Sequence, residues 1–277
     1  MTGTGATPLV ARPPRWEPHS WTGGSWSGRV ACVLCPNPSP LTLEGTNTWV
    51  VGEPGHSDCL VIDPGPADEA HLEAILAVVA GRRVAQVLLT HRHPDHAEGA
   101  PEFAARVDAP VRAFGAGSDD LTDGEVIREA GAELSVLASP GHTSDSVCFL
   151  LRGDGALFSG DTVLGWGTSV VTWPDGVLGD YLASLAKIEK AIHSGVVTDI
   201  LPGHGGPLAD AAATVAFYRR HRLERLDQVR SAVAQGARDA DEVVEQVYAD
   251  VDRSLWPAAA LSVRAQLDYL TSGDVVV

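Results

Sequence analysis

Four residues that can bind a metal ion occur within six positions, directly after an apolar segment. Residues 84–89 have the character of a buried strand, and the sequence Thr90-His91-Arg92-His93-Pro94-Asp95-His96 follows them. Imidazole and carboxylate groups are the ligands that zinc uses in catalytic sites. A strand that ends in a turn can direct alternate side chains into one cleft, so this block predicts a fold that carries a metal site at the end of a strand.

Three more candidate ligands occur in a similar context, each at or just after an apolar strand and beside a glycine. They are His142 in Ser139-Pro140-Gly141-His142-Thr143, Asp161 in Phe158-Ser159-Gly160-Asp161, and His204 in Leu201-Pro202-Gly203-His204-Gly205. Glycine permits the tight turns that let the next side chain project into a site. Together with the first block, these residues make seven ligands of suitable chemistry.

Short apolar runs and segments with helical periodicity alternate along residues 29–208. We expect strands at 29–34, 47–51, 60–63, 84–89, 111–114, 125–128, 134–138, 146–151, 156–159 and 197–201, and helices at 67–80, 100–107 and 179–193. The sequence Gly153-Asp154-Gly155 predicts a tight hairpin turn. Strands and helices alternate in two halves, which predicts an α/β (α+β) fold with helices over a largely antiparallel or mixed pair of sheets.

The two ends of the chain differ from this central part. Residues 1–28 are rich in Pro, Gly, Ser and Thr and predict an irregular arm, in which Trp16, Trp21 and Trp26 cover a neighbouring surface. From 209 onward we expect a helix to about 234, a second one opening near 239–241, a third at 257–270, and a turn into a terminal strand at 275–277. We therefore expect a winged-helix-like domain at 209–277 or, alternatively, a plain helical cap.

Charge and cysteine content limit the possible partners and location. The chain has 20 basic and 36 acidic residues, a net charge of −16, which disfavours indiscriminate binding to DNA, RNA or membrane surfaces. No apolar run approaches the roughly 18 residues of a membrane span, and residues 1–14 lack the features of a signal peptide. The four cysteines are too few for a disulfide scaffold, and Cys32 and Cys35 are interpreted as ordinary strand-end residues. We expect a cytoplasmic protein without membrane or DNA partners.

The motifs HxHxDH, PGHT, SGD and PGHG together resemble those of the metallo-β-lactamase superfamily. The resemblance implies an αββα sandwich with two zinc ions at one edge. It assigns His91, His93 and His142 to the first metal, and Asp95, His96 and His204 to the second, with Asp161 bridging both. It also implies hydrolysis by a metal-bridging hydroxide that the catalytic residue Asp95 orients and deprotonates.

Differences between this sequence and known subfamilies limit which members of the superfamily it resembles. True β-lactamases of this fold usually have cysteine where Asp161 stands, so antibiotic hydrolysis is not expected. The segments 37–39, 43–52, 159–168 and 180–185 are similar to the β-lactamase-like protein 2 group. That group includes endoribonucleases that cut single-stranded RNA, and polyketide-associated thioesterases are similar to it.

Two enzymatic functions remain open at this point. The first is a phosphodiesterase acting on single-stranded RNA, guided by Arg219, Arg222 and Arg225 at helical spacing and by Thr168 near the site. The net charge and the lack of an aromatic stacking run speak against it, and the arginines are also consistent with a solvated helix face. The second is a thioesterase or glyoxalase-II-like hydrolase of a small acylated thiol. A non-catalytic scaffold is a third alternative, which seven intact ligands disfavour. The sequence leaves the oligomeric state open.

Overall fold

The structure is a computed structural model that describes residues 21–115 and 120–272. Trp16 and the expected terminal strand at 275–277 lie outside the described residues. Within them, every expected strand and helix is present, with bounds within two residues of the expected ones. No helix in this part of the chain combines the length and the apolar character that crossing a lipid bilayer requires.

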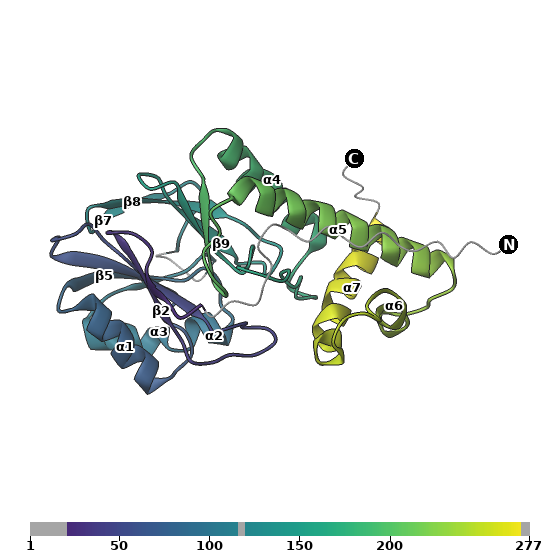
Figure 1. Cartoon of the computed structure of the whole chain (residues 1–277), viewed down its shortest axis with the longest axis horizontal. Coiled ribbons are helices and arrows are strands. Elements are labelled where there is room, and N and C mark those ends of the chain that lie inside the picture. Colours follow the sequence, from purple (N-terminus) through teal and green to yellow (C-terminus); the bar gives the residue numbers. More distant parts are fainter. Residues whose placement is uncertain (1–20, 116–119, 273–277) are drawn as a thin grey trace.

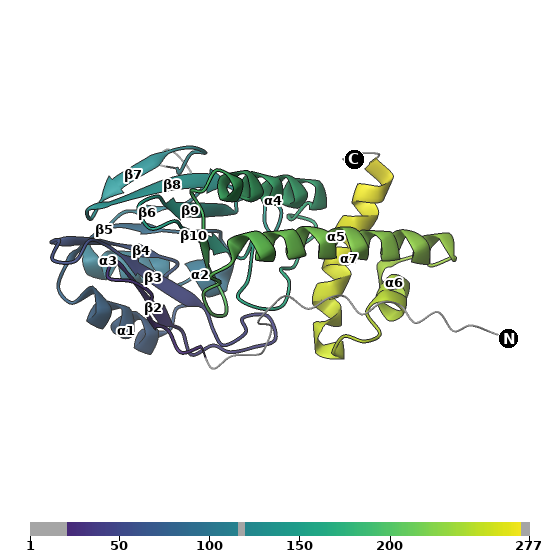
Figure 2. The same cartoon turned by 45° about the horizontal axis from the view of Figure 1, so that its top comes forward.

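The strands form two sheets, which Figures 1 and 2 show facing each other. The first has the order β1-β2-β3-β4-β5-β6 and consists of Gly24–Ser25, Val30–Leu34, Asn47–Val51, Asp58–Ile62, Arg83–Leu88 and Val111–Arg112. The second has the order β11-β10-β9-β8-β7; in chain order from β7, its strands are Val126–Glu129, Ala132–Ala138, Val147–Leu151, Ala156–Gly160 and Asp199–Pro202. Parallel pairs occur at β4/β5, β5/β6 and β10/β11, and the other neighbours are antiparallel, so both sheets are mixed.

The main hydrophobic core lies between the two sheets. It combines Trp49, Ile62 and Leu88 of the first sheet with Phe149 and Phe158 of the second. The Trp49 and Phe158 rings meet edge to face, with centroids 5.7 Å apart, a favoured arrangement for aromatic pairs. Burial of these inward-facing side chains holds the sheets together.

Helices cover the outer face of each sheet (Figure 1). Helices α1 (Glu69–Val79) and α3 (Ala100–Val107) pack on the first sheet through a second cluster of buried residues. Helices α4 (Leu178–His193) and α5 (Ala211–Ala234) pack on the second sheet through a third. The layers are therefore helix, sheet, sheet, helix, which confirms the expected sandwich.

Helix α5 continues beyond the sandwich into the C-terminal part. Val215 and Tyr218 belong to the cluster on the second sheet, whereas Val229 and Ala232 pack with α6 (Ala240–Val247) and α7 (Trp256–Ser272). In Figure 1, α5 runs from beside α4 to the yellow-green C-terminal helices. The boundary at 208/209 stays a prediction, and the N-terminal half of α5 shares its core with the sandwich.

Three short elements were not expected from the sequence: strand β1, helix α2 (Pro94–Ala97) and the 3₁₀ turn Arg253–Leu255. Each has four residues or fewer, too short for a periodic pattern to form. In the described part of the N-terminal arm, the indoles of Trp21 and Trp26 pack against the core between the sheets.

Candidate metal centre

The turn after β5 carries four of the seven expected ligands. His91 and His93 lie between β5 and α2, and His93 is the N-cap of that helix. Pro94 begins the helix, a position that suits proline because its missing N–H would have no intrahelical partner there. Asp95 and His96 follow within the same short helix. One turn therefore places four polar side chains close together.

The other three ligands follow strands of the second sheet. Strands β8 and β10 are both antiparallel to β9, and β11 is parallel to β10, so all three run in the same direction. Their C-terminal ends lie at one edge of the sheet. His142, Asp161 and His204 lie in the loops that leave these ends, so the two sheets bring all seven expected ligands together.

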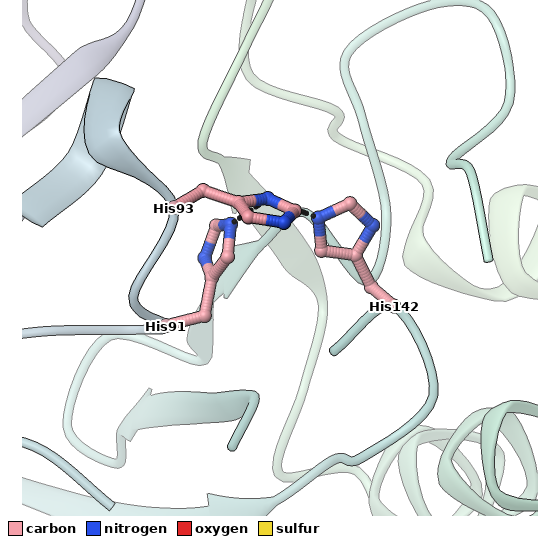
Figure 3. A group of neighbouring side chains, drawn as sticks. All are labelled: His91, His93 and His142. Carbon is pink, nitrogen blue, oxygen red and sulfur yellow. Dashed lines mark hydrogen bonds between the residues drawn. The ribbon is translucent and has the colours of Figure 1, made fainter. Parts of the chain in front are cut away.

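A first group consists of His91, His93 and His142 (Figure 3). The Nδ1 atom of His93 lies 3.1 Å from Nε2 of His91 and 3.0 Å from Nε2 of His142. Nitrogen ligands of one tetrahedral zinc ion, at 2.0–2.1 Å from the metal, are about 3.3 Å apart. The observed spacing is close to that value.

A second group consists of Asp95, His96 and His204. Nε2 of His204 lies 3.2 Å from Nε2 of His96 and 3.2 Å from Oδ2 of Asp95. Oδ2 of Asp161 lies 3.3 Å from Nε2 of His204 and 3.7 Å from Nε2 of His142. The Asp161 carboxylate therefore stands between the two groups.

Backbone and side-chain oxygens contact the Nδ1 atoms of four of the five imidazoles. Nδ1 of His142 lies 2.6 Å from the Val170 carbonyl, and Nδ1 of His204 lies 3.1 Å from the Gly45 carbonyl. A carbonyl oxygen only accepts hydrogen bonds, so each of these Nδ1 atoms carries the proton. Nδ1 of His96 faces the Asp63 carboxylate, and Nδ1 of His91 faces the Thr90 hydroxyl. The Nε2 atoms of these four rings are thereby directed inward.

The cluster combines neutral imidazoles with ionised carboxylates, which favours binding of a cation. Burial lowers the pKa of His91, and lowers that of His142 to about 4, so both rings are neutral. Burial also opposes charge on His204, but ionised Asp161 outweighs it and raises the pKa of His204 to about 9. Burial opposes ionisation of Asp161 too, and nearby His204 and His96 nevertheless lower its pKa well below the usual range. In the chain alone, a proton on His204 thus compensates the carboxylate, and a bound metal ion would replace such protons.

The surroundings of Asp161 Oδ1 and of Gly203 are consistent with an ion-binding site. Oδ1 of Asp161 is buried and lies 3.4 Å from Nε2 of His96, but it accepts no hydrogen bond among the described residues, which is rare for a buried carboxylate oxygen. A Cβ atom on Gly203 would lie 2.5 Å from this Oδ1 and 2.8 Å from Cε1 of His96. Only glycine fits at this position. The His/Asp cluster can therefore bind metal.

Sequence comparison identifies the family. Residues 41–128 and 113–204 match the metallo-β-lactamase superfamily, and residues 240–277 match the β-lactamase-associated winged helix domain. The chain belongs to the metallo-β-lactamase superfamily. This confirms the resemblance expected from the four motifs, and it identifies the C-terminal helices as part of a winged-helix domain rather than a plain helical cap.

Relatives of this superfamily member include proteins named as thioesterases and proteins named as β-lactamase-like protein 2 homologues. The atrochrysone carboxyl ACP thioesterase of Aspergillus chevalieri is 34% identical over 80% of this chain and 74% of its own length. The β-lactamase-like protein 2 homologues of Drosophila melanogaster and Caenorhabditis elegans are both 32% identical. Their alignments cover 87% and 90% of this chain, and 87% and 86% of the respective relatives. These relatives support a metal-dependent hydrolase.

Solved structures of the superfamily share the fold. A metallo-β-lactamase family protein from Thermus thermophilus superposes with a TM-score of 0.73 at 22% identity, covering 90% of this chain and 95% of its own. A β-lactamase domain protein from Burkholderia ambifaria gives a TM-score of 0.76 at 20% identity, covering 92% and 90%. Both comparisons extend over the sandwich and the C-terminal helices.

Asp63 is a functional candidate that the sequence analysis missed. It follows β4, is 1% exposed, and has a positive φ of 51°. Its carboxylate accepts hydrogen bonds from the Thr90 backbone N–H at 2.7 Å and the Thr90 hydroxyl at 2.6 Å, and contacts His96. The available signal was an acidic residue at the end of an apolar strand, as for Asp161, but without the SGD motif that contains Asp161.

The residues expected to contact substrate fall into two places. Thr168, Arg222 and Arg225 line one cavity of about 140 Å³ between the loop after β10, α5 and the C-terminal helices. Arg219 is exposed and lines a different depression, together with Glu189. The three arginines therefore do not form one basic face, and their role in substrate binding stays a prediction.

Proposed function

We propose that the chain is a dinuclear zinc hydrolase that cleaves thioesters of a thiol carrying an anionic group. The observation that carries the metal chemistry is the convergence of seven ligand side chains: two groups of three, with Asp161 between them. His91, His93 and His142 would hold one ion, Asp95, His96 and His204 the other, and Asp161 would contact both.

The zinc ions would lower the pKa of a water molecule and polarise the carbonyl group that it attacks. Asp95 is the residue placed to move a proton. Burial raises its pKa, but the hydrogen bond and charges of His204 and His96 lower it more, so that the carboxylate stays ionised at neutral pH. Its side chain is 29% exposed, whereas that of Asp161 is only 10% exposed. Asp95 can therefore accept a proton and pass it to solvent or to the leaving thiolate.

The cavity beside the cluster supports the choice of substrate. Arg222 and Arg225 both line it, and none of the described residues that line it is acidic. The Arg225 guanidinium donates to Gln228 and to the Val247 carbonyl, which are neutral partners. Two positive charges without a carboxylate favour an anionic ligand. A cavity of this size suits one phosphate or carboxylate better than an extended polyanion.

The cavity and the metal cluster share one wall. Thr168, Ser169 and Val170 line the cavity, and the Val170 carbonyl contacts His142. A substrate anchored in the cavity by its anionic group would thus be held beside the cluster. The thioesterase relative of Aspergillus chevalieri agrees with this substrate class.

Cleavage of single-stranded RNA is the second candidate. It is favoured by the matches to β-lactamase-like protein 2 homologues, which extend over 87% and 90% of the chain, a group that the sequence resemblance associates with endoribonucleases. The separation of Arg219 from Arg222 and Arg225 removes the phosphate-binding helix face that this function would use.

The test uses purified, zinc-supplemented protein and three substrates: acetyl-phosphopantetheine, acetyl-pantetheine and a fluorescently labelled single-stranded RNA. We expect hydrolysis of both thioesters, a lower KM for the phosphorylated one, and loss of activity with a chelator. Thioester hydrolysis that survives complete metal removal would contradict the zinc mechanism. RNA cleavage without thioester hydrolysis would select the second candidate.

A further inference from the structure

The loop after Asp161 lies between the metal cluster and the C-terminal helices. On one side it contacts His142: the Val170 carbonyl accepts the Nδ1–H at 2.6 Å, and the Thr172 backbone N–H donates to the His142 carbonyl at 3.1 Å. This loop therefore orients the ring and fixes the backbone of one expected metal ligand.

On its other side the same loop is held by α5 and α7. The Arg222 guanidinium donates to the Ser169 carbonyl, and the Ser262 hydroxyl accepts the Val171 backbone N–H at 3.1 Å. The residues on both sides of Val170 are thus held by α5 and α7. A few residues earlier, the Tyr218 hydroxyl accepts the Leu164 backbone N–H at 2.8 Å.

Burial makes these contacts difficult to replace by water. Arg222 is 5% exposed, Ser262 is 6% exposed and Ser169 is 3% exposed. The Arg222 guanidinium also lies over the Tyr181 ring, 4.9 Å from its centroid. An arginine without a carboxylate partner is costly to bury, and a carbonyl left without its donor would be equally costly. Loss of Arg222 would therefore let the backbone at Ser169 and Val170 rearrange.

We infer that Arg222 is a positioning residue for the metal ligand His142, acting through the Ser169–Val170 backbone. Helices α5 and α7 thereby contribute to metal affinity at the sandwich, besides any contact they make with substrate. This inference rests on the proposed metal centre. Mutation of the hydrogen-bond partner of a ligating histidine commonly lowers metal affinity 10- to 100-fold. Arg222 does not contact His142 itself but binds the backbone next to its partner, the Val170 carbonyl.

The test compares zinc affinity in Arg222→Met, Ser262→Ala and the matched control Arg225→Met. Arg225 is one turn along the same helix and also donates to a backbone carbonyl, that of Val247 at the end of α6. Competition with a chromophoric chelator should show zinc binding weakened about tenfold in Arg222→Met and severalfold in Ser262→Ala. Arg225→Met should stay within about twofold of wild type.

A second measurement reports on the ring itself. In zinc-loaded protein labelled with ¹⁵N-histidine, the Nδ1–H signal of His142 should exchange faster with solvent in Arg222→Met than in Arg225→Met. Thermal unfolding identifies variants that fail to fold. If Arg222→Met fails to fold, the zinc affinity of Ser262→Ala is compared with that of wild type and Arg225→Met instead.

Equal zinc affinity in folded Arg222→Met and wild type would overturn the inference, and so would equal losses in both arginine variants. Wild type that binds no zinc would instead remove the proposed metal centre itself, so the two failures are distinguishable.

Discussion

Asp63 and His96 are joined by a buried contact of 3.0 Å between Oδ2 of the carboxylate and Nδ1 of the ring. The same oxygen accepts the Thr90 hydroxyl, which in turn faces Nδ1 of His91. One carboxylate therefore orients a histidine of each ligand group. Asp63→Asn should weaken zinc binding about 10- to 100-fold, because outer partners fix ligand orientation. Chelator competition on the folded variant measures this, and wild-type affinity would show that the contact has no such role.

Asp161 is expected to determine the number of bound ions. Its Oδ2 faces His204 at 3.3 Å and His142 at 3.7 Å, so it serves both groups. Wild type should bind two zinc ions per chain, and Asp161→Asn, which removes the bridging charge, should bind one or none. Elemental analysis after zinc supplementation and desalting gives the count. A wild-type value of one or less would contradict the dinuclear proposal.

The two locations of the arginines predict a difference in substrate binding. Arg225→Gln should raise KM for acetyl-phosphopantetheine about 10- to 150-fold, because a hydrogen bond to a charged group contributes about 1.5–3 kcal/mol. Arg219→Gln makes the same change outside the cavity and should leave KM within about twofold. Steady-state kinetics test both variants, with acetyl-pantetheine as the uncharged control. If Arg219→Gln had the larger effect, the cavity would not be the anion site.

His71 predicts how stability depends on pH. Burial lowers its pKa to about 4, below the value of about 6.5 expected in the unfolded chain. The unfolded state therefore takes up a proton first as pH falls, so the free energy of unfolding decreases from about pH 6.5 to pH 4. His71→Gln should show a shallower decrease than wild type in urea unfolding across this range. Identical pH profiles would mean that His71 does not contribute.

The clustering of the seven expected ligands could be predicted from sequence because all of them lie in segments that follow apolar strands. Strand ends converge at sheet edges, so His142, Asp161 and His204 could be expected together before their contacts were known. The expected strands and helices are also present, since periodicity and glycine-containing turns determine them locally.

Arg222 shows what the sequence could not reveal. Arginines spaced along a helix predict a solvated or anion-binding face, because charged side chains are rarely buried. Arg222 is buried because the Ser169 carbonyl and the Tyr181 ring, from elements distant in sequence, supply its partners. The difference in burial between Arg222 and exposed Arg219 is therefore visible only in the tertiary structure.

Helix α5 also limits how the molecule can move. It spans 24 residues, about 36 Å at 1.5 Å per residue, and packs in both the sandwich and the winged-helix domain. Domain rotation usually takes place at loop residues that absorb backbone changes, and the interior of a continuous helix provides none. Opening the two parts at this connection would require bending α5 or exposing one of its hydrophobic clusters. We therefore expect substrate to enter and leave through local movement of side chains and loops, without rotation of the winged-helix domain relative to the sandwich.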